Sequence, residues 1–545
     1  MNSVFTRKAE ARETPGRLSL IRITAVCLTA VFLLISCNFP RVDYQSTAVF
    51  LAARQTMVAQ EHMPTGLPAQ DSPATPNVPG QAFQDPQPTP LPLETLAPVQ
   101  PTPETLCDLA LIPGNQLYCT RSGDRLETVA RRFRVANPYQ IQGAEGFAIK
   151  TVLPVNTPLG VPSPTFYAPY DQVVFPDSEV LYGPDAAKSD IIAYAAHANG
   201  YLNSYGEYLY GGWYSGPEII DLVARETSTN PRLLLSLTEF QSGWLFGWPE
   251  GAETNDSPLN YDADGVEGLY EELQVAAREL SRGFYGWREG SINGLFYQDG
   301  KNNFIAPELN PGSVAVQNLF AGLYDSAEFY NALYSPNGFI ALHNSLFGDP
   351  WQRSALMGTL MPPNLTQPEM TLPFLPGETW ALTAGPHLTW QNGSPRGAVD
   401  LAPVDNQPGC IPSPMWATAA VPGLVVRSER GAVAIDLDGD GNEGTGWVLV
   451  YMHMLPEGRA PVGTWLDQDD PVGHPSCAGG TSTGTHLHIA RKYNGEWLSV
   501  EAPYPFVMGG WQAVAGSGNY AGKLVNGERV VYVGSSAKSY TWISR

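Results

Sequence analysis

The sequence predicts a multidomain chain: a small α+β module, then a central all-α domain, then a C-terminal, mainly antiparallel β domain. At 545 residues the chain is too long for a single core. Apolar residues recur every three or four positions between about 170 and 365, which predicts helices. After residue 370 the pattern changes to short apolar runs separated by turns rich in Gly and Asp, which predicts strands.

The charge balance excludes one class of partner. The chain has 31 basic and 53 acidic residues, and its formal net charge is −22. Nucleic-acid binding depends on clustered Lys and Arg side chains that neutralise phosphates. We therefore expect no nucleic-acid partner.

Residues 1–36 have the composition of an export signal. Basic residues precede the apolar run ITAVCLTAVFLLISC, which is short for a membrane span. The run ends in Leu-Ile-Ser-Cys, which resembles the lipobox of bacterial lipoproteins. The resemblance implies lipidation of Cys37 and a lipid anchor in the bilayer, at the outer face of the cell membrane and facing the wall. An uncleaved signal anchor is the alternative.

Residues 37–105 are expected to be a linker. Between Pro64 and Pro103 prolines recur every few residues, with almost no charged or aromatic side chains. Such a segment cannot build a core, so we expect an extended, semi-rigid tether.

Residues 106–165 predict a small α+β module. Apolar residues after Gly123-Asp124 fall at helical spacing, namely Leu126, Val129, Ala130 and Phe133. Together with the later LPVNTPLGVP, this pattern resembles a LysM module, which implies binding of glycans that contain N-acetylglucosamine. The middle segment QIQGAEGFAIK departs from the usual second helix, so a structural spacer is the alternative.

Four cysteines remain outside the signal and the lipobox, and four cysteines allow three pairings. Disulfides are expected in an exported chain. Adjacency in the domain layout favours Cys107 with Cys119 and Cys410 with Cys477.

The helical domain, residues 170–365, contains one residue that invites chemistry. Glu239 lies near the end of a predicted helix that starts after Asn230, with Gly243 as its stop signal. This arrangement resembles lysozyme-like lytic transglycosylases, in which a Glu at a helix end is the general acid on a glycosidic bond. The alternative is a Glu that lines a cleft without catalysing. His197 and His343 are expected to be solvated or core histidines.

The β domain, residues 370–545, contains a segment with clear strand and turn signals. GLVVRSERGAVAIDLDGDGNEGTGWVLVYMHM predicts three strands joined by an Arg-Gly turn and a Gly/Asp-rich turn. The second turn, at 436–444, has the carboxylates of a calcium loop but lacks the full twelve-residue ligand spacing. We expect a hairpin connection there.

Five of the eight histidines fall in this last domain. His486 and His488 lie two apart in a predicted strand, so their side chains point to the same face. Two imidazoles side by side suit a pair in which one binds a metal and the other acts on the substrate. Alone, such a pair also occurs by chance on the wet side of a sheet.

Further motifs in the same domain indicate that the pair His486 and His488 is part of a larger site. GPH…VDLAP, TGWVLVYMHM, VGHPSCAGGTSTGTHLHIARKYNGEW and PFVMGGW follow one another between about Trp380 and Ser517. They resemble the lysostaphin/LytM-type zinc endopeptidases that cut peptidoglycan peptides, and within them the beta-lytic, staphylolysin-like branch. The resemblance implies one Zn²⁺ per chain held by three ligands, with two active-site histidines beside it: ligands His387, Asp400 and His488, active-site histidines His453 and His486.

The implied ligand set is chemically sensible, because two imidazoles and one carboxylate leave a fourth position for water. In the commoner branch the first ligand lies four residues before the Asp, where this chain has Arg396. The beta-lytic branch takes that ligand from a Gly-x-His, which Gly385-Pro386-His387 matches, so we expect an intact site. The same branch has a disulfide where Cys410 and Cys477 fall. His474 has no assigned role and is expected in a loop near the cleft rim.

The favoured hypothesis is a membrane-anchored zinc endopeptidase that hydrolyses peptide cross-links of bacterial peptidoglycan, with the module and the helical domain assisting its positioning. One alternative is a wall-binding scaffold that regulates partner hydrolases, against which the five matching positions count. The other is a bifunctional enzyme that also cleaves glycan through Glu239.

Overall fold

The computed structural model describes residues 107–162, 172–249, 257–261, 265–405, 409–501, 503–534 and 536–545. All of them belong to one compact unit, residues 83–545. The expected signal, Cys37 and the linker lie outside the described residues. Within the described ranges no helix combines the length and the apolar character needed to cross a membrane.

The N-terminal module folds around one helix. β1 (Asn115–Cys119) pairs antiparallel with β2 (Pro158–Pro162), and the apolar face of α3 (Leu126–Arg132) is fully buried in a small separate core. The order strand, helix, strand is as expected. After α3 the described residues up to β2 contain a single 3₁₀ turn, η1 (Pro138–Gln140), and no second α-helix, since the Gly-containing segment after this turn has no helical periodicity.

The helices of the next part begin and end where the capping signals stand. The Asn230 side chain accepts from the Arg232 backbone N–H (3.0 Å) at the start of one helix, and Gly243 adopts φ 67° at its end. The α-helices described here are α4 (Ile191–Ala196), α5 (Gly216–Thr227), α6 (Pro231–Ser242), α7 (Gly268–Glu289), α8 (Pro311–Leu323), α9 (Phe329–Tyr334), α10 (Phe339–Phe347) and α11 (Pro350–Met357). Two short hairpins accompany them: β3 (Gly206–Leu209) with β4 (Gly212–Ser215), and β5 (Gly294–Phe296) with β6 (Asn302–Phe304).

Helical periodicity alone does not reveal where this part breaks. The apolar segment 189–205 contains only α4, which ends at Ala196, and a 3₁₀ turn, and between them the backbone turns at Asn199 (φ 53°) and Gly200. A Cβ at Gly200 would lie 2.2 Å from the Leu245 carbonyl oxygen, so the close packing of these two loops requires glycine.

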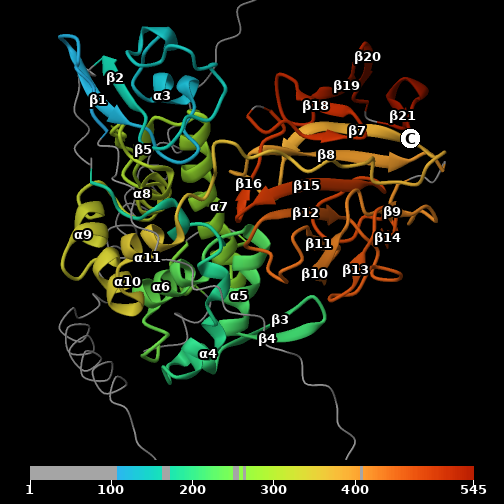
Figure 1. Cartoon of the computed structure of the whole chain (residues 1–545). Helices are drawn as coiled ribbons and strands as arrows, with labels where there is room; N and C mark the ends of the chain where they lie inside the picture. The colour runs from blue at the N-terminus through green and yellow to red at the C-terminus, as the bar shows by residue number, and fades with distance from the viewer. Residues whose placement is uncertain are drawn as a thin grey trace, which may run out of the picture. The chain divides into compact units, whose positions relative to one another are not determined.

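The C-terminal part is built on antiparallel sheets. In Figure 1 its long strands β7, β8, β15 and β12 run side by side. The main sheet has the order β13-β10-β11-β12-β15-β8-β7-β21, with β16 paired to β15. Its strands are β7 (Thr379–Leu388), β8 (Arg396–Pro403), β10 (Gly423–Glu429), β11 (Ala432–Asp436), β12 (Trp447–Met452), β13 (Trp465–Leu466), β15 (Leu487–Tyr493), β16 (Glu496–Trp497) and β21 (Trp542–Ser544).

Smaller pieces complete this part: β9 (Ala417–Thr418) with β14 (Pro471–Gly473), and β17 (Val507–Met508), β18 (Trp511–Ala515), β19 (Gly522–Asn526) and β20 (Arg529–Tyr532). The mixture of helices and antiparallel sheet expected from the sequence is confirmed. The strands β10, β11 and β12 and their two turns follow the predicted pattern.

The two faces of the main sheet pack into different hydrophobic cores. Val399, Leu401 and Ile489 belong to a core within the β part. Ala398, Val450 and Ala490 alternate with such residues and share a continuous core with the helices. Side chains in a strand alternate between faces, so Asp400 and His488 lie on the helix-facing side. The helical part therefore packs on the same face of the sheet that presents these polar residues.

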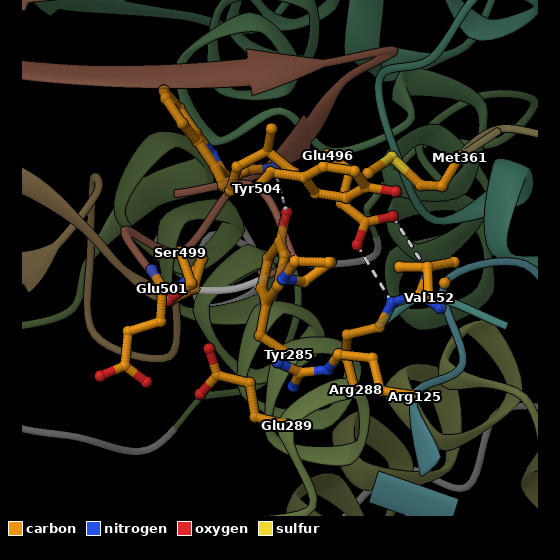
Figure 2. Close-up of a pocket in the computed structure, with 15 residues that line it drawn as sticks. Arg125, Val152, Tyr285, Arg288, Glu289, Met361, Glu496, Ser499, Glu501 and Tyr504 are labelled. Carbon is orange, nitrogen blue, oxygen red and sulfur yellow. Dashed lines mark hydrogen bonds and ion pairs between the residues drawn. The ribbon is translucent and has the colours of Figure 1, made fainter. Parts of the chain in front are cut away.

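Arg288 of α7 connects the three parts at a small cavity shown in Figure 2. Its guanidinium bonds Glu496 of β16 (2.9 and 3.0 Å) and Asp177 (3.1 Å), and it reaches the Ser122 carbonyl of the N-terminal module. Burial alone would lower the pKa of Arg288, but the carboxylates of Glu496 and Asp177 raise it above its usual value. Such a buried, fully paired cation fixes how the three parts meet.

Candidate metal centre

Three buried side chains from three adjacent strands converge on one point. His387 comes from β7, Asp400 from β8 and His488 from β15, and one ligand atom of each lies within 4.8 Å of the others. Asp400 and His488 are direct cross-strand partners. The register of β7 shifts on both sides of His387. Such bulges re-aim a side chain, which here directs the His387 ring toward β8.

The distances within this group are short. His387 Nε2 and His488 Nδ1 are 3.0 Å apart, and each lies 3.2 Å from Asp400 Oδ1. Although burial alone would raise it, the neighbouring imidazoles of His387 and His488 hold the pKa of Asp400 well below its usual range, so the carboxylate is ionised.

In each ring, the hydrogen bond of the outer nitrogen, which points away from Asp400, fixes the tautomer and so the role of the inner nitrogen, which faces Asp400. His387 Nδ1 donates to the Gly385 carbonyl (2.9 Å), and His488 Nε2 donates to the Thr389 carbonyl (3.0 Å). A carbonyl oxygen only accepts, so in the neutral rings both inner nitrogens present lone pairs. Among the described residues Asp400 Oδ1 also has no hydrogen-bond donor. Three electron-pair donors directed at one another fit a cation, and carbonyl-oriented histidines with a carboxylate are typical of zinc sites.

His486 and His453 lie beside these three residues. His486 Nδ1 donates to the Gly484 carbonyl (2.7 Å) and its Nε2 lies 3.4 Å from Asp400 Oδ2. His453 Nδ1 donates to the Ala478 carbonyl (3.0 Å), and the centres of the two rings are 4.4 Å apart. Burial and the nearby His486 lower the pKa of His453 to about 4. In its neutral form each ring therefore presents Nε2 as the nitrogen that can accept a proton.

The backbone at His453 is held in an uncommon conformation. It follows β12 with φ 66°, in the left-handed region that costs a non-glycine residue on the order of 1 kcal/mol or more. Its carbonyl accepts from the Ser476 backbone N–H (2.7 Å) and hydroxyl (2.8 Å), which fixes the strained residue from outside. Strain that is over-determined by neighbours is typical of functional positions.

The structure adds Tyr520, which the sequence did not indicate. Its ring stacks on His387, with ring centres 4.7 Å apart. The approach depends on Gly385, whose N–H donates to the Tyr520 carbonyl (3.0 Å) and where a Cβ would lie 2.7 Å from the backbone of Ala521. In the sequence, the glycine of the Gly-x-His motif indicates a close backbone approach at Gly385, but it does not indicate that Tyr520 is the residue that approaches.

Arg396 lies away from the three donors. Its guanidinium donates to the Gly516 carbonyl (2.9 Å), so His387 and not Arg396 meets the carboxylate of Asp400.

The disulfides join Cys107 to Cys119 and Cys410 to Cys477, which is the pairing favoured from the sequence. Cys477 directly precedes Ala478, whose carbonyl orients His453.

His474 ends the short strand β14 and does not reach the donors. Its ring lies on Trp416 (3.7 Å between centres), and its Nδ1 donates to the Met415 carbonyl (3.0 Å). This gives the histidine a packing role in the loops around β9 and β14.

Glu239 lies at the end of α6, as expected. Its Oε2 accepts the Leu245 backbone N–H (2.8 Å), which closes the loop after the helix. This contact gives the carboxylate a structural role. The Asp-rich turn connects β11 to β12 as a hairpin, with carboxylates of Asp436, Asp438 and Asp440 within 4.8 Å of one another.

The sheet brings together two imidazoles and one carboxylate, with two further histidines beside them, and such a donor set suits a catalytic zinc site. Residues 173–363 match the family described as "LasA, N-terminal domain". The chain is homologous to Protease LasA of Pseudomonas aeruginosa, with 26% identity over 371 residues, which cover 63% of this chain and 78% of the relative.

Two solved structures are similar to part of this chain. The M23 metalloprotease pseudoalterin is 21% identical, and the match covers 30% of this chain and 95% of that chain with a TM-score of 0.26. The catalytic domain of lysostaphin from Staphylococcus simulans is 19% identical, and the match covers 23% of this chain and 89% of that chain with a TM-score of 0.16.

Proposed function

We propose that the chain is a zinc endopeptidase that hydrolyses peptide cross-links of bacterial peptidoglycan. The observation that carries this proposal is the meeting of His387 Nε2, His488 Nδ1 and Asp400 Oδ1 within 3.0 to 3.2 Å of one another, with the outer nitrogen of each ring on a backbone carbonyl. Homology to Protease LasA supports the same enzyme class.

Each residue has a role that follows from its contacts. His387, Asp400 and His488 hold the zinc ion, which when bound polarises the scissile carbonyl and acidifies water. His486 and His453 accept and return the proton during hydrolysis, because each donates Nδ1–H to a carbonyl and so has Nε2 as the acceptor of its neutral ring. The Gly484 and Ala478 carbonyls keep both rings in that tautomer.

The proposal extends to where the enzyme works. A lipid on Cys37 and the Pro-rich linker hold the catalytic part at the outer face of the membrane, within reach of the wall. The LysM-like module adds a weak glycan contact that raises the local concentration of substrate. The strand, helix and strand of that module, stapled by Cys107–Cys119, support this assignment.

Muropeptide analysis of purified peptidoglycan tests the activity. The zinc-loaded full chain is expected to release peptide-cleaved fragments, and His488→Ala is expected to abolish them. His197→Ala is the matched control, since this exposed histidine bonds only its own helix in the described structure. If the wild-type chain cuts nothing, the wall-binding scaffold is the hypothesis that remains. If it also releases glycan fragments, and these disappear in Glu239→Gln, the chain is a bifunctional enzyme.

A further inference from the structure

The hairpin β3–β4 carries an aromatic pair on its outer face. Tyr208 and Trp213 are cross-strand partners with ring centres 5.9 Å apart, and they are 63% and 74% exposed. The other face of the hairpin turns Leu209 and Tyr214 toward the helical core. Two large aromatic side chains paired on an exposed surface are unusual unless they bind something.

The turn of this hairpin lies against Arg430. The Arg430 guanidinium lies 4.5 Å from the centre of the Tyr210 ring and pairs with Glu226 of α5. Arg430 and Gly431 form the turn between β10 and β11, and Gly431 packs on Ala478. The Ala478 carbonyl in turn orients His453. A chain of contacts through Arg430, Gly431 and Ala478 therefore links the turn of the aromatic hairpin to His453.

The charge of this hairpin indicates which kind of ligand its aromatic pair can bind. Residues 206–215 contain Glu207 and no Lys or Arg, and the whole chain has a net charge of −22. An anionic membrane surface attracts basic segments, so this hairpin does not suit one. Flat, exposed aromatic rings suit the apolar C–H faces of uncharged sugar rings, which lose water on stacking.

We infer that Tyr208 and Trp213 form a glycan subsite that stacks on pyranose rings of the strand whose peptide enters the metal centre. This inference rests on the proposed function and deepens it, because it assigns the sugar part of the substrate to the helical part of the chain. The subsite would make intact wall a better substrate than the same peptide without sugar.

Steady-state kinetics on two substrates tests this subsite. The full chain, a Tyr208→Ala/Trp213→Ala double variant and the control Tyr540→Ala, an equally exposed tyrosine at 63%, are compared on intact peptidoglycan and on glycan-free cross-linked stem peptides. For the double variant KM on intact peptidoglycan is expected to rise about tenfold. Its kcat, its KM on free peptides, its Tm and all values for Tyr540→Ala are expected to stay unchanged.

Three results would overturn the inference. They are an equal change of KM on both substrates, a gain of activity on free peptides, which would show a hairpin that blocks the site, and binding to anionic phosphatidylglycerol vesicles that the double variant loses. Failure of the wild-type chain to cut either substrate would instead contradict the proposed function, so the two ideas fail in different ways.

Discussion

Two buried sites in this molecule place a histidine against a carboxylate, yet their chemistry differs. In the helical part, Glu179 Oε1 accepts from His343 Nε2 (3.1 Å) and from Arg232 Nε (3.3 Å), while its Oε2 pairs with Arg353 (2.9 Å). His343 Nδ1 bonds the Ser236 hydroxyl (2.9 Å). In the β part, Asp400 meets three imidazoles, and no Lys or Arg of the described chain pairs with it.

The difference lies in the source of the positive charge. Although burial alone would raise it, the bond from His343 and the charges of Arg232 and Arg353 lower the pKa of Glu179 to about 2. Both nitrogens of His343 are used by this network, so no donor remains for a metal. At Asp400 the two inner nitrogens have no protein partner other than each other and the carboxylate. That arrangement suits a cation taken up from solution, as the proposed function requires.

The largest effect is expected at the metal site. Asp400→Asn keeps the shape but removes the negative charge between the two imidazoles, so we expect hydrolysis of peptidoglycan to fall on the order of 10³-fold or more. Glu179→Gln is the counterpart in the helical part and should leave the specific activity of the folded protein unchanged. Equal losses of specific activity in the two variants would contradict the distinction between the sites.

Stability should respond in the opposite order. Glu179→Gln leaves the charges of Arg232 and Arg353 buried without their anion, so we expect the free energy of unfolding to fall by about 3–5 kcal/mol. Denaturant unfolding with the metal removed measures this, and Asp400→Asn is expected to change the result much less. A loss below about 1 kcal/mol for Glu179→Gln would show that this network is not a stabilising ion pair.

The sequence anticipated one of these two sites and not the other. His387, Asp400, His453, His486 and His488 were named from motifs, and the structure brings all five together. Strand parity explains part of this success, since it fixes which face His486 and His488 share.

The remaining features depend on tertiary contacts that no local pattern encodes. The bonds of Glu179 to His343 and Arg353 join segments more than 160 residues apart. Tyr520 reaches His387 only because the β18–β19 loop folds back over Gly385. The break at Gly200 likewise depends on a loop that packs from the end of α6.

Acid should remove the contribution of the Glu179 network. The pKa of this carboxyl is about 2 in the folded chain and near its ordinary value of 4.5 when unfolded, so its stabilisation is complete above about pH 4.5 and is lost as pH falls toward 2. Burial lowers the pKa of His343, which adds a loss in the same direction as pH falls below about 6.5. The unfolding free energies of wild type and Glu179→Gln should therefore converge in acid, and a gap that stays constant from pH 7 to pH 3 would refute this account.

A smaller effect is expected at Tyr520. Tyr520→Ala removes the ring that stacks on His387 but leaves the three donors in place, so we expect zinc affinity to fall by up to about tenfold. Competition with a chelator measures this affinity. Tyr532→Ala, a similarly exposed tyrosine on β20, is the control and should not change it.

The central claim is that His387, Asp400 and His488 together hold one zinc ion. Metal analysis of the full chain after dialysis tests it most directly, with His488→Ala and the control His197→Ala measured beside the wild type. We predict one zinc per chain in the wild type and in His197→Ala, and none in His488→Ala. Zinc retained at one per chain in folded His488→Ala would contradict the account.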